Sequence, residues 1–299
     1  MNVLEIRALE KRFGDKRVLC GLDMCVPEGR VFGFVGRNGA GKTTTMKSVL
    51  GLIKPDGGEI LLAGEKVRFG QTPTNRHVGY LPDVPEFYSF MTPREYLRLC
   101  GECMEMSDKE IKSRSGELLE LVGLGSENRR IKGFSRGMKQ RLGVAQALLG
   151  GPKLLICDEP TSALDPIGRR EILDVLMSVK DRTTVLFSTH ILSDVESICT
   201  DVALLDGGKI AMQGSVSELK REGRKEEFAV EMMDADSAQK LCEAFPDAVR
   251  EDRVTVSFSG GEERIFEVLS FIGANKLPLR RIERAEPSLE SLFAEVVGK

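Results

Sequence analysis

Apolar and polar positions in the first fifth of the chain mark a short strand followed by a helix. Residues 30–35, RVFGFV, are almost continuously apolar and rich in β-branched and aromatic side chains, which is typical of a buried strand. Residues 44–50 contain no glycine or proline and place apolar side chains at helical spacing. The glycine-rich segment 36–43, GRNGAGKT, therefore connects a strand to a helix.

The same patterning continues downstream. Residues 135–149 keep a helical apolar stripe between Ser135, a good N-cap residue, and a Gly-Gly-Pro stop. Residues 153–160, KLLICDEP, predict a second buried strand that ends in two acids, and 183–190, TTVLFSTH, predict a third. One helix fits between them, at about 167–180. This alternation predicts an α/β fold.

The pattern changes after Ser217. Residues 218–227, ELKREGRKEE, are a charge run that predicts a solvated helix end and a linker. We expect two domains, 1–220 and 221–299, and the βαββαβ order of the second predicts a small α+β domain of the ferredoxin-like type. Its expected elements are strand 228–233, helix 236–245, strands 247–251 and 253–259, helix 262–273, strand 277–285 and a closing helix from Ser288.

Composition narrows the classes of function. The chain has 299 residues, with 43 basic and 46 acidic side chains, so nothing argues for a nucleic-acid partner. The amino-terminal segment is interrupted by charges, and no apolar run approaches the length of a membrane span, which predicts a soluble, cytoplasmic protein. Seven cysteines fit reduced thiols better than a disulfide framework, and we interpret Cys100-x-x-Cys103 as incidental.

The glycine-rich segment carries the strongest chemical indication. It fits G-x-x-x-x-G-K-[ST] between a strand and a helix, where glycines let backbone N–H groups surround an anion and the helix start adds its positive dipole end. We predict that Lys42 reaches the β- and γ-phosphates of a nucleotide and that Thr43 binds Mg²⁺. The competing interpretation is a glycine-rich turn with an exposed lysine. The predicted phosphate site comprises Gly36, Arg37, Asn38, Gly39, Ala40, Gly41, Lys42, Thr43 and Thr44.

Two acids and a second helix start extend this site. Asp158 can hold Mg²⁺ through water beside Thr43, and Glu159 can polarise an attacking water, although a solvated acidic turn is the alternative. The helix beginning at Ser135 offers its hydroxyl and the Gly137 amide to a further anion. One chain would then have two phosphate-binding helix starts, one more than a monomer needs.

The motifs, in this order, resemble the nucleotide-binding subunits of ATP-binding cassette (ABC) transporters over about residues 3–218. The matching segments are GRNGAGKTT, FSRGM, LLICDEP, Ser162-Ala163-Leu164-Asp165 and FSTH. The resemblance implies a P-loop NTPase core with a helical subdomain at about 84–150, ATPase activity, and ATP and Mg²⁺ as cofactors. It also implies an integral membrane permease as partner and a peripheral location on the inner face of the cell membrane.

The resemblance further implies residue roles and a dimer. Two copies, or this chain and a homologous cassette, would pair head to tail. Ser135 and Gly137 of one subunit would then face the ATP bound in the phosphate site of the other, residues 36–44, which we call the cradle. Phe13 would stack on adenine, with a core aromatic as the alternative. Glu159 would be the general base, His190 would sense the γ-phosphate, where a lone buried histidine is the alternative, and Asp165 would lie in the loop that links the two sites.

Two positions depart from the common family pattern. The signature Leu-Ser-Gly-Gly-Gln is replaced by Phe-Ser-Arg-Gly-Met at 134–138, which keeps the hydroxyl and the second glycine. Asp83 stands where the family usually has glutamine, and it can bind Mg²⁺ through water. Both departures resemble cassettes of simple efflux systems with a separate permease. Beyond Asp83, Phe87, Tyr88 and Phe90 occupy the surface that receives a helix of the membrane partner in this family, unless they are buried internally.

The expected function is an ATPase subunit that powers transport, in the direction of export, through a permease. One alternative is an ATP-dependent switch without transport, of the translation or DNA-repair type. The chain has a single cradle, however, and no long heptad run lies between Lys42 and Ser135. The other alternative is the ATPase subunit of an importer.

Overall fold

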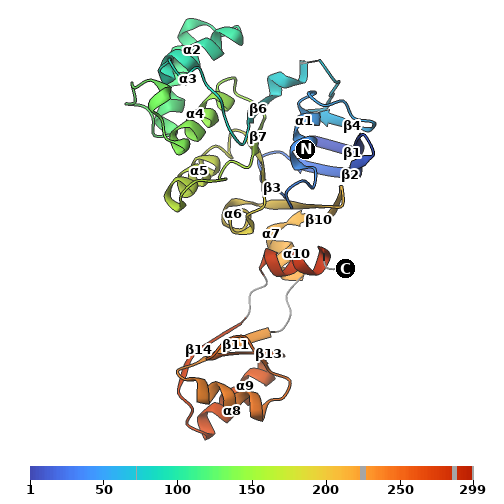
Figure 1. Ribbon diagram of the computed structural model, residues 1–299, viewed down its shortest axis with the longest axis vertical. Coiled ribbons are helices and arrows are strands. Elements are labelled where there is room, and N and C mark those ends of the chain that lie inside the picture. The colour runs from blue at the N-terminus through green and yellow to red at the C-terminus, as the bar shows by residue number, and fades with distance from the viewer. Residues whose placement is uncertain (72, 223–226, 285–287, 298–299) are drawn as a thin grey trace. The chain divides into compact units, whose positions relative to one another are not determined.

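The structure is a computed structural model that describes residues 1–71, 73–222, 227–284 and 288–297. Its internal contacts divide the chain into two units, Met1–Val216 together with the residues from 296 onward, and Ser217–Glu295 (Figure 1). The first unit contains β1 (Asn2–Phe13), β2 (Lys16–Pro27), β3 (Val31–Gly36), α1 (Lys42–Val49), β4 (Gly57–Leu62), β5 (Glu65–Lys66), η1 (Pro73–His77), β6 (Val78–Leu81), α2 (Pro93–Cys103), α3 (Asp108–Leu121), η2 (Ile131–Gly133), α4 (Arg136–Leu148), β7 (Leu154–Asp158), α5 (Pro166–Ser178), β8 (Thr184–Thr189), α6 (Leu192–Ile198), β9 (Asp201–Asp206) and β10 (Lys209–Ser215).

A mixed sheet, in the order β10-β9-β3-β8-β7-β6, forms the centre of the first unit. Strand β3 is buried along its whole length, as its apolar sequence predicts, and it runs parallel to β8 and β9. Strands β8, β7 and β6 continue the parallel arrangement. The segments that follow β3, β8, β7 and β6 therefore all leave the sheet at one edge, where α/β sheets place ligands.

A second, antiparallel sheet, in the order β2-β1-β4-β5, packs on the same core. Its inward side chains, such as Leu4 and Leu22, join Phe32 of β3, Met46 of α1 and Ile156 of β7 in one cluster of fully buried residues. Burial of a large apolar side chain stabilises a fold by about 1.5–3 kcal/mol, so this shared core holds α1 and the two sheets together.

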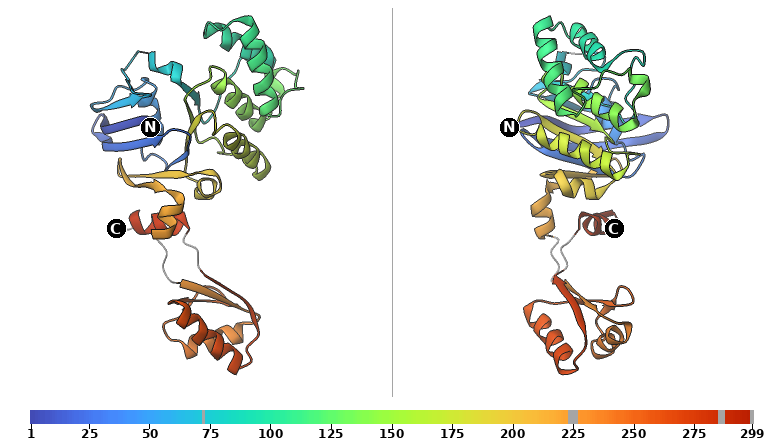
Figure 2. Two further views of the ribbon diagram at one scale, coloured as in Figure 1. Left: turned by 180° about the vertical axis from the view of Figure 1, so that it is seen from behind. Right: turned by 90° about the vertical axis from the view of Figure 1, so that its left-hand side faces the viewer.

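Helices α2, α3 and α4 form a separate group within the first unit, within the range expected for a helical subdomain. The sequence encodes two of the helix starts as capping boxes, Thr92 with Glu95 for α2 and Ser107 with Glu110 for α3. In Figure 1 and in the left view of Figure 2, these helices lie on one side of the parallel sheet and the antiparallel sheet lies on the other.

The second unit has the predicted ferredoxin-like topology. Its sheet is antiparallel in the order β12-β13-β11-β14, and helices α8 and α9 cover one face of it (Figure 2). Buried aromatic and aliphatic residues such as Phe228, Phe258 and Val268 form its core. Its elements are α7 (Val216–Glu222), β11 (Glu227–Met232), α8 (Ala235–Ala244), β12 (Val249–Arg250), β13 (Thr255–Ser259), α9 (Glu262–Ala274), β14 (Leu279–Arg284) and α10 (Leu289–Val297).

Element bounds differ from the expected ones at a few ends. Helix α1 begins at Lys42 rather than at residue 44, because Gly41 adopts a left-handed conformation and serves as its N-cap. The strand expected at 247–251 is reduced to the two residues of β12. Residues 223–226 of the predicted linker and residue 285 lie outside the described residues.

Candidate active site

The loop between β3 and α1 has the backbone geometry that its glycines predict. Gly39 and Gly41 have φ values of 80° and 117°, which favour glycine. At Gly36, a Cβ atom would lie 2.8 Å from the carbonyl oxygen of Leu205, so a side chain there would displace backbone. The turn closes through a bond from the Ala40 amide to the Arg37 carbonyl (3.1 Å). The glycines at 36, 39 and 41 therefore allow a tight loop with an exposed backbone at the amino-terminal end of α1.

Lys42 is the only buried lysine or arginine in the part of the chain that the structure describes. Its amine donates a hydrogen bond to the carbonyl oxygen of Gly36 (2.6 Å) and forms an ion pair with Glu159 (3.2 Å). Because burying an unpaired charge is costly, Glu159 stabilises the lysine in this position. The predicted phosphate-binding cation thus lies folded into the loop and next to the predicted base.

Asp158, at the carboxyl end of β7, is hydrogen-bonded to Thr43. The Thr43 hydroxyl donates to one carboxylate oxygen (2.8 Å) and the Ser188 hydroxyl to the other (2.7 Å). Asp158 and Thr43 present the hard oxygen ligands that Mg²⁺ prefers, and they come from neighbouring segments at the same sheet edge. These residues therefore fit a Mg²⁺ site.

Glu159 and His190 form a second pair at this edge. The carboxylate of Glu159 lies 2.9 Å from Nδ1 of His190, which follows β8, and its other oxygen contacts Lys42. The backbone amide of Glu159 donates to the backbone oxygen and the hydroxyl of Ser188, and the residue has a left-handed φ of 48°. His190 is 46% exposed at its side chain, which disagrees with the alternative of a buried core histidine.

Ser188 and Ser162 lie in the family-matching segments, but no individual role was predicted for either of them. Ser188 is fully buried in β8 and contacts both acids, and a polar residue inside an apolar strand was the available indication. The hydroxyl of Ser162 donates a hydrogen bond to the carboxylate of Asp83.

The side chain of Asp83 contacts Ser162 and Arg136 and not the Thr43–Asp158 pair. It bonds to Ser162 and lies 3.5 Å from the guanidinium of Arg136 in the signature segment. The two positions that depart from the common family pattern thus contact each other. Burial raises the pKa of nearby Tyr80 to about 12, with smaller contributions from the charges of Asp158 and Asp83. The role of Asp83 in metal binding stays a prediction.

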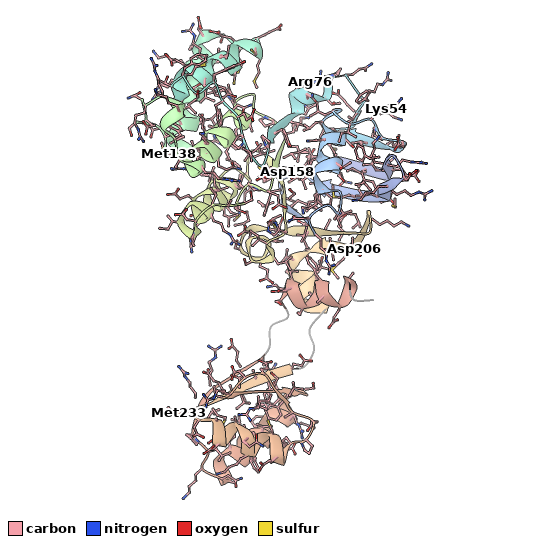
Figure 3. The ribbon with its side chains drawn as sticks, viewed as in Figure 1. Lys54, Arg76, Met138, Asp158, Asp206 and Met233 are labelled. Carbon is pink, nitrogen blue, oxygen red and sulfur yellow. The ribbon has the colours of Figure 1, made fainter. Side chains whose placement is uncertain are left out.

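The remaining predicted residues occupy other surfaces of the first unit. Phe13, at the end of β1, is 50% exposed, which argues against a core role, and the Lys11 amine lies 5.2 Å from its ring centroid. Ser135 is the exposed N-cap of α4 and accepts from the amide of Met138 (3.2 Å). Asp165 is the N-cap of α5. Figure 3 shows Met138 among the helices, away from Asp158 at the centre of the unit.

Comparison with known proteins identifies the family. The sequence model described as "ABC transporter" matches residues 19–162, and that described as "ATP-binding protein DrrA1-3-like, C-terminal domain" matches residues 214–297. The uncharacterized ABC transporter ATP-binding protein YxlF of Bacillus subtilis (strain 168) is 37% identical, with 99% of each chain covered. The chain belongs to the ABC transporter ATP-binding proteins.

Further relatives agree with this assignment. The bacitracin transport ATP-binding protein BcrA of Bacillus licheniformis is 37% identical to this ABC transporter ATP-binding protein, over 99% of this chain and 98% of that protein. A solved ATP-binding subunit of an ABC transporter is 32% identical, covers 74% of this chain and 92% of its own, and superposes with a TM-score of 0.67. CbiO1 from Clostridium perfringens is 25% identical, with a TM-score of 0.69 over 82% of this chain and 96% of its own.

The family resemblance, the fold and the ATPase function predicted from the motifs are therefore confirmed. This ABC transporter ATP-binding protein binds and hydrolyses ATP as a subunit of a transporter. The alternative of an ATP-dependent switch without transport is not supported, since the matching relatives are transporter subunits. No helix in the described ranges combines the length and apolar character that a membrane span requires.

Proposed function

We propose that this subunit hydrolyses ATP at the edge formed by β3, β7 and β8. The observation that carries the proposal is the chain of contacts from Lys42 to Glu159 and from Glu159 to His190, beside the Thr43–Asp158 pair. Lys42 and the loop 36–44 would bind the phosphates, Glu159 would accept a proton from the attacking water, and His190 would orient Glu159 and contact the γ-phosphate. The rest of the nucleotide would extend toward Phe13, which offers an exposed aromatic face.

Thr43 and Asp158 would hold Mg²⁺, with Asp83 as a further acid that acts through water. The cation would neutralise charge on the β- and γ-phosphates. In the structure each carboxylate oxygen of Asp158 accepts a hydrogen bond from a hydroxyl, and these two bonds orient the carboxylate. This orientation by neighbouring groups supports the assignment.

The active form would be a head-to-tail dimer of two copies, or of this chain with a homologous cassette. Ser135 and Gly137 lie at an exposed helix start, so they are accessible to the ATP of a second subunit. Asp165 caps the adjacent helix α5 and would belong to the loop that connects the two sites.

Export, through a separately encoded permease, is the transport direction we infer. Two relatives are named as bacitracin transport proteins, and each covers nearly this whole chain. The subunit would lie in the cytoplasm, on the inner face of the cell membrane, held there by its permease.

A groove in the helical group supports permease docking. It has a volume of about 470 Å³ and is open to solvent. Val84, one of its lining residues, is 60% exposed, and Tyr88 and Phe90 of the same segment are also exposed, whereas Phe87 packs edge-on against Tyr96 (5.0 Å between centroids). The groove is lined by Val84, Pro85, Glu86, Phe87, Ser89, Ile131, Arg136 and Lys139.

Val84→Asp should weaken association with the permease, because it places a charge in the apolar part of the groove. We expect an affinity-tagged variant to recover at least about tenfold less permease from detergent-solubilised membranes, corresponding to roughly 1.4 kcal/mol. Phe69→Asp is the matched control, since Phe69 is comparably exposed (54%) but lies outside the groove. Equal recovery of the permease by the Val84 variant and the wild-type chain would contradict the docking proposal.

The proposed domain boundary at about residue 220 gives a further prediction. All of the site residues named above precede it, and the first unit has its own buried core. A chain that ends at residue 220 should fold and keep measurable basal ATPase activity, which a phosphate-release assay can determine. A truncated chain with a cooperative unfolding transition but no activity would place part of the site beyond the boundary.

A further inference from the structure

Buried Thr161 and Asp194 form a polar network with Arg169, whose side chain is 29% exposed, and none of the predicted roles explains this network. Asp194, on α6, is only 2% exposed. The Thr161 hydroxyl donates to one of its carboxylate oxygens (2.8 Å), and Nε of Arg169 donates to the other (2.5 Å). The guanidinium also reaches the hydroxyl of Ser193 (2.9 Å). Each oxygen of this buried acid therefore has a donor, which satisfies the requirement for burying a charge.

The network joins the two segments that carry Glu159 and His190. Thr161 lies two residues after Glu159, and Asp194 lies four residues after His190. The contact between Thr161 and Asp194 is thus a further bond between the same two segments, in addition to the Glu159–His190 contact and the bonds of Ser188 to both acids. The residue between Glu159 and Thr161 is proline, whose fixed φ limits independent movement of the two side chains.

The backbone around Thr161 needs such support. Glu159 and Ala163 both have left-handed φ values, 48° and 51°, although neither is glycine. Residues in this region are strained and persist only where the surroundings hold them. Thr161 is 2% exposed and sits between them, so its bond to Asp194 fixes the turn at its midpoint.

We propose that Asp194, with Arg169, is a positioning residue for ATP hydrolysis, acting through Thr161 on Glu159 and through α6 on His190. The proposal rests on the function proposed for Glu159. The network would hold the carboxylate of Glu159 within the narrow range of positions from which it can take a proton from water. Misplacement of a catalytic group by about 1 Å can lower a rate on the order of 10²-fold.

Thr161→Val tests this directly, because it removes the hydroxyl at nearly constant volume. We expect kcat for ATP to fall by about 10-fold or more. The affinity for a fluorescent ATP analogue should stay unchanged, since the phosphate loop makes its own contacts through Lys42. Thr161→Ser, which keeps the hydroxyl, should restore most of kcat. Ser193→Ala is the matched control, because it removes only the outer contact of Arg169.

A double variant separates positioning from a merely structural role. In a Glu159→Gln chain the positioned base is already absent, so adding Thr161→Val should lower hydrolysis no further. Additive losses, a parallel loss of ATP affinity, or a wild-type kcat for Thr161→Val would each overturn the proposal. If Thr161→Val does not fold, Arg169→Gln decides the question by the same measurements, because it acts on Asp194 from the other side.

Different outcomes would contradict the role of Glu159 as the base and the positioning role of Asp194 and Arg169. If Glu159→Gln hydrolyses ATP at the wild-type rate, the role proposed for Glu159 is wrong. If Glu159→Gln is inactive while Thr161→Val and Arg169→Gln keep the wild-type kcat, only the positioning role is wrong.

Discussion

Glu159→Gln should bind ATP but hydrolyse it about 10²–10⁴-fold more slowly than the wild-type chain, the loss typical of removing a general base. Glutamine keeps the size of the side chain and a polar contact for Lys42 and His190, which lie 3.2 Å and 2.9 Å from the carboxylate. It lacks the basic oxygen that would accept a proton from water. Steady-state phosphate release measures the rate, and binding of a fluorescent ATP analogue measures affinity.

The control for this variant is Glu117→Gln. Glu117 pairs with Arg182 at the surface, so the same chemical change there should leave hydrolysis unaltered. A Glu159→Gln chain that turns over ATP at the wild-type rate would show that another group activates the water.

Lys42→Ala should abolish detectable ATP binding. Lys42 is 5% exposed, its amine donates a hydrogen bond to the Gly36 carbonyl oxygen within the loop, and it is the only buried lysine or arginine among the described residues. Alanine removes the charge proposed to bind the β- and γ-phosphates and leaves Glu159 without its Lys42 ion-pair partner. A titration with the fluorescent analogue checks this, and Lys47→Ala, on the exposed side of the same helix, should bind normally. Unchanged affinity in the Lys42 variant would rule out the loop as the phosphate site.

The sequence was most informative where local chemistry dictates structure. The loop 36–43 needs glycines for its backbone conformation, and β3 and β7 are buried on both faces, so their apolar runs are continuous. The βαββαβ order of the second unit likewise followed from period-two and helical patterns, because each element buries one face against its neighbours.

The antiparallel sheet of β1, β2 and β4 was not predicted. Its strands are interrupted by charged residues on the solvent face and by register shifts, which obscure the alternation in the sequence. Its pairing also joins residues far apart in the chain, such as Leu4 with Leu62, and a single sequence does not reveal such partners.

The polar side-chain contacts around the site could not be predicted from the sequence either. Asp194 and Thr161 are ordinary helix and loop residues until the fold brings them to 2.8 Å. The pairing of Asp83 with Arg136 depends in the same way on how α4 lies against the segment after β6. In contrast, Asp158 and Glu159 were identified because a strand that ends in two acids is visible without any tertiary information.

In the proposed dimer, two phosphate loops and two Ser135 helix starts enclose ATP between the subunits, and light scattering coupled to size-exclusion chromatography measures whether this dimer forms. Glu159→Gln should be a monomer without nucleotide and a dimer with saturating ATP, because trapped ATP would hold both subunits. Adding Ser135→Arg should abolish that dimer by placing bulk and charge at the exposed start of α4. A Glu159→Gln chain that binds ATP and stays monomeric would contradict a sandwich of two copies, and a dimer that survives Ser135→Arg would contradict the role of Ser135 in it.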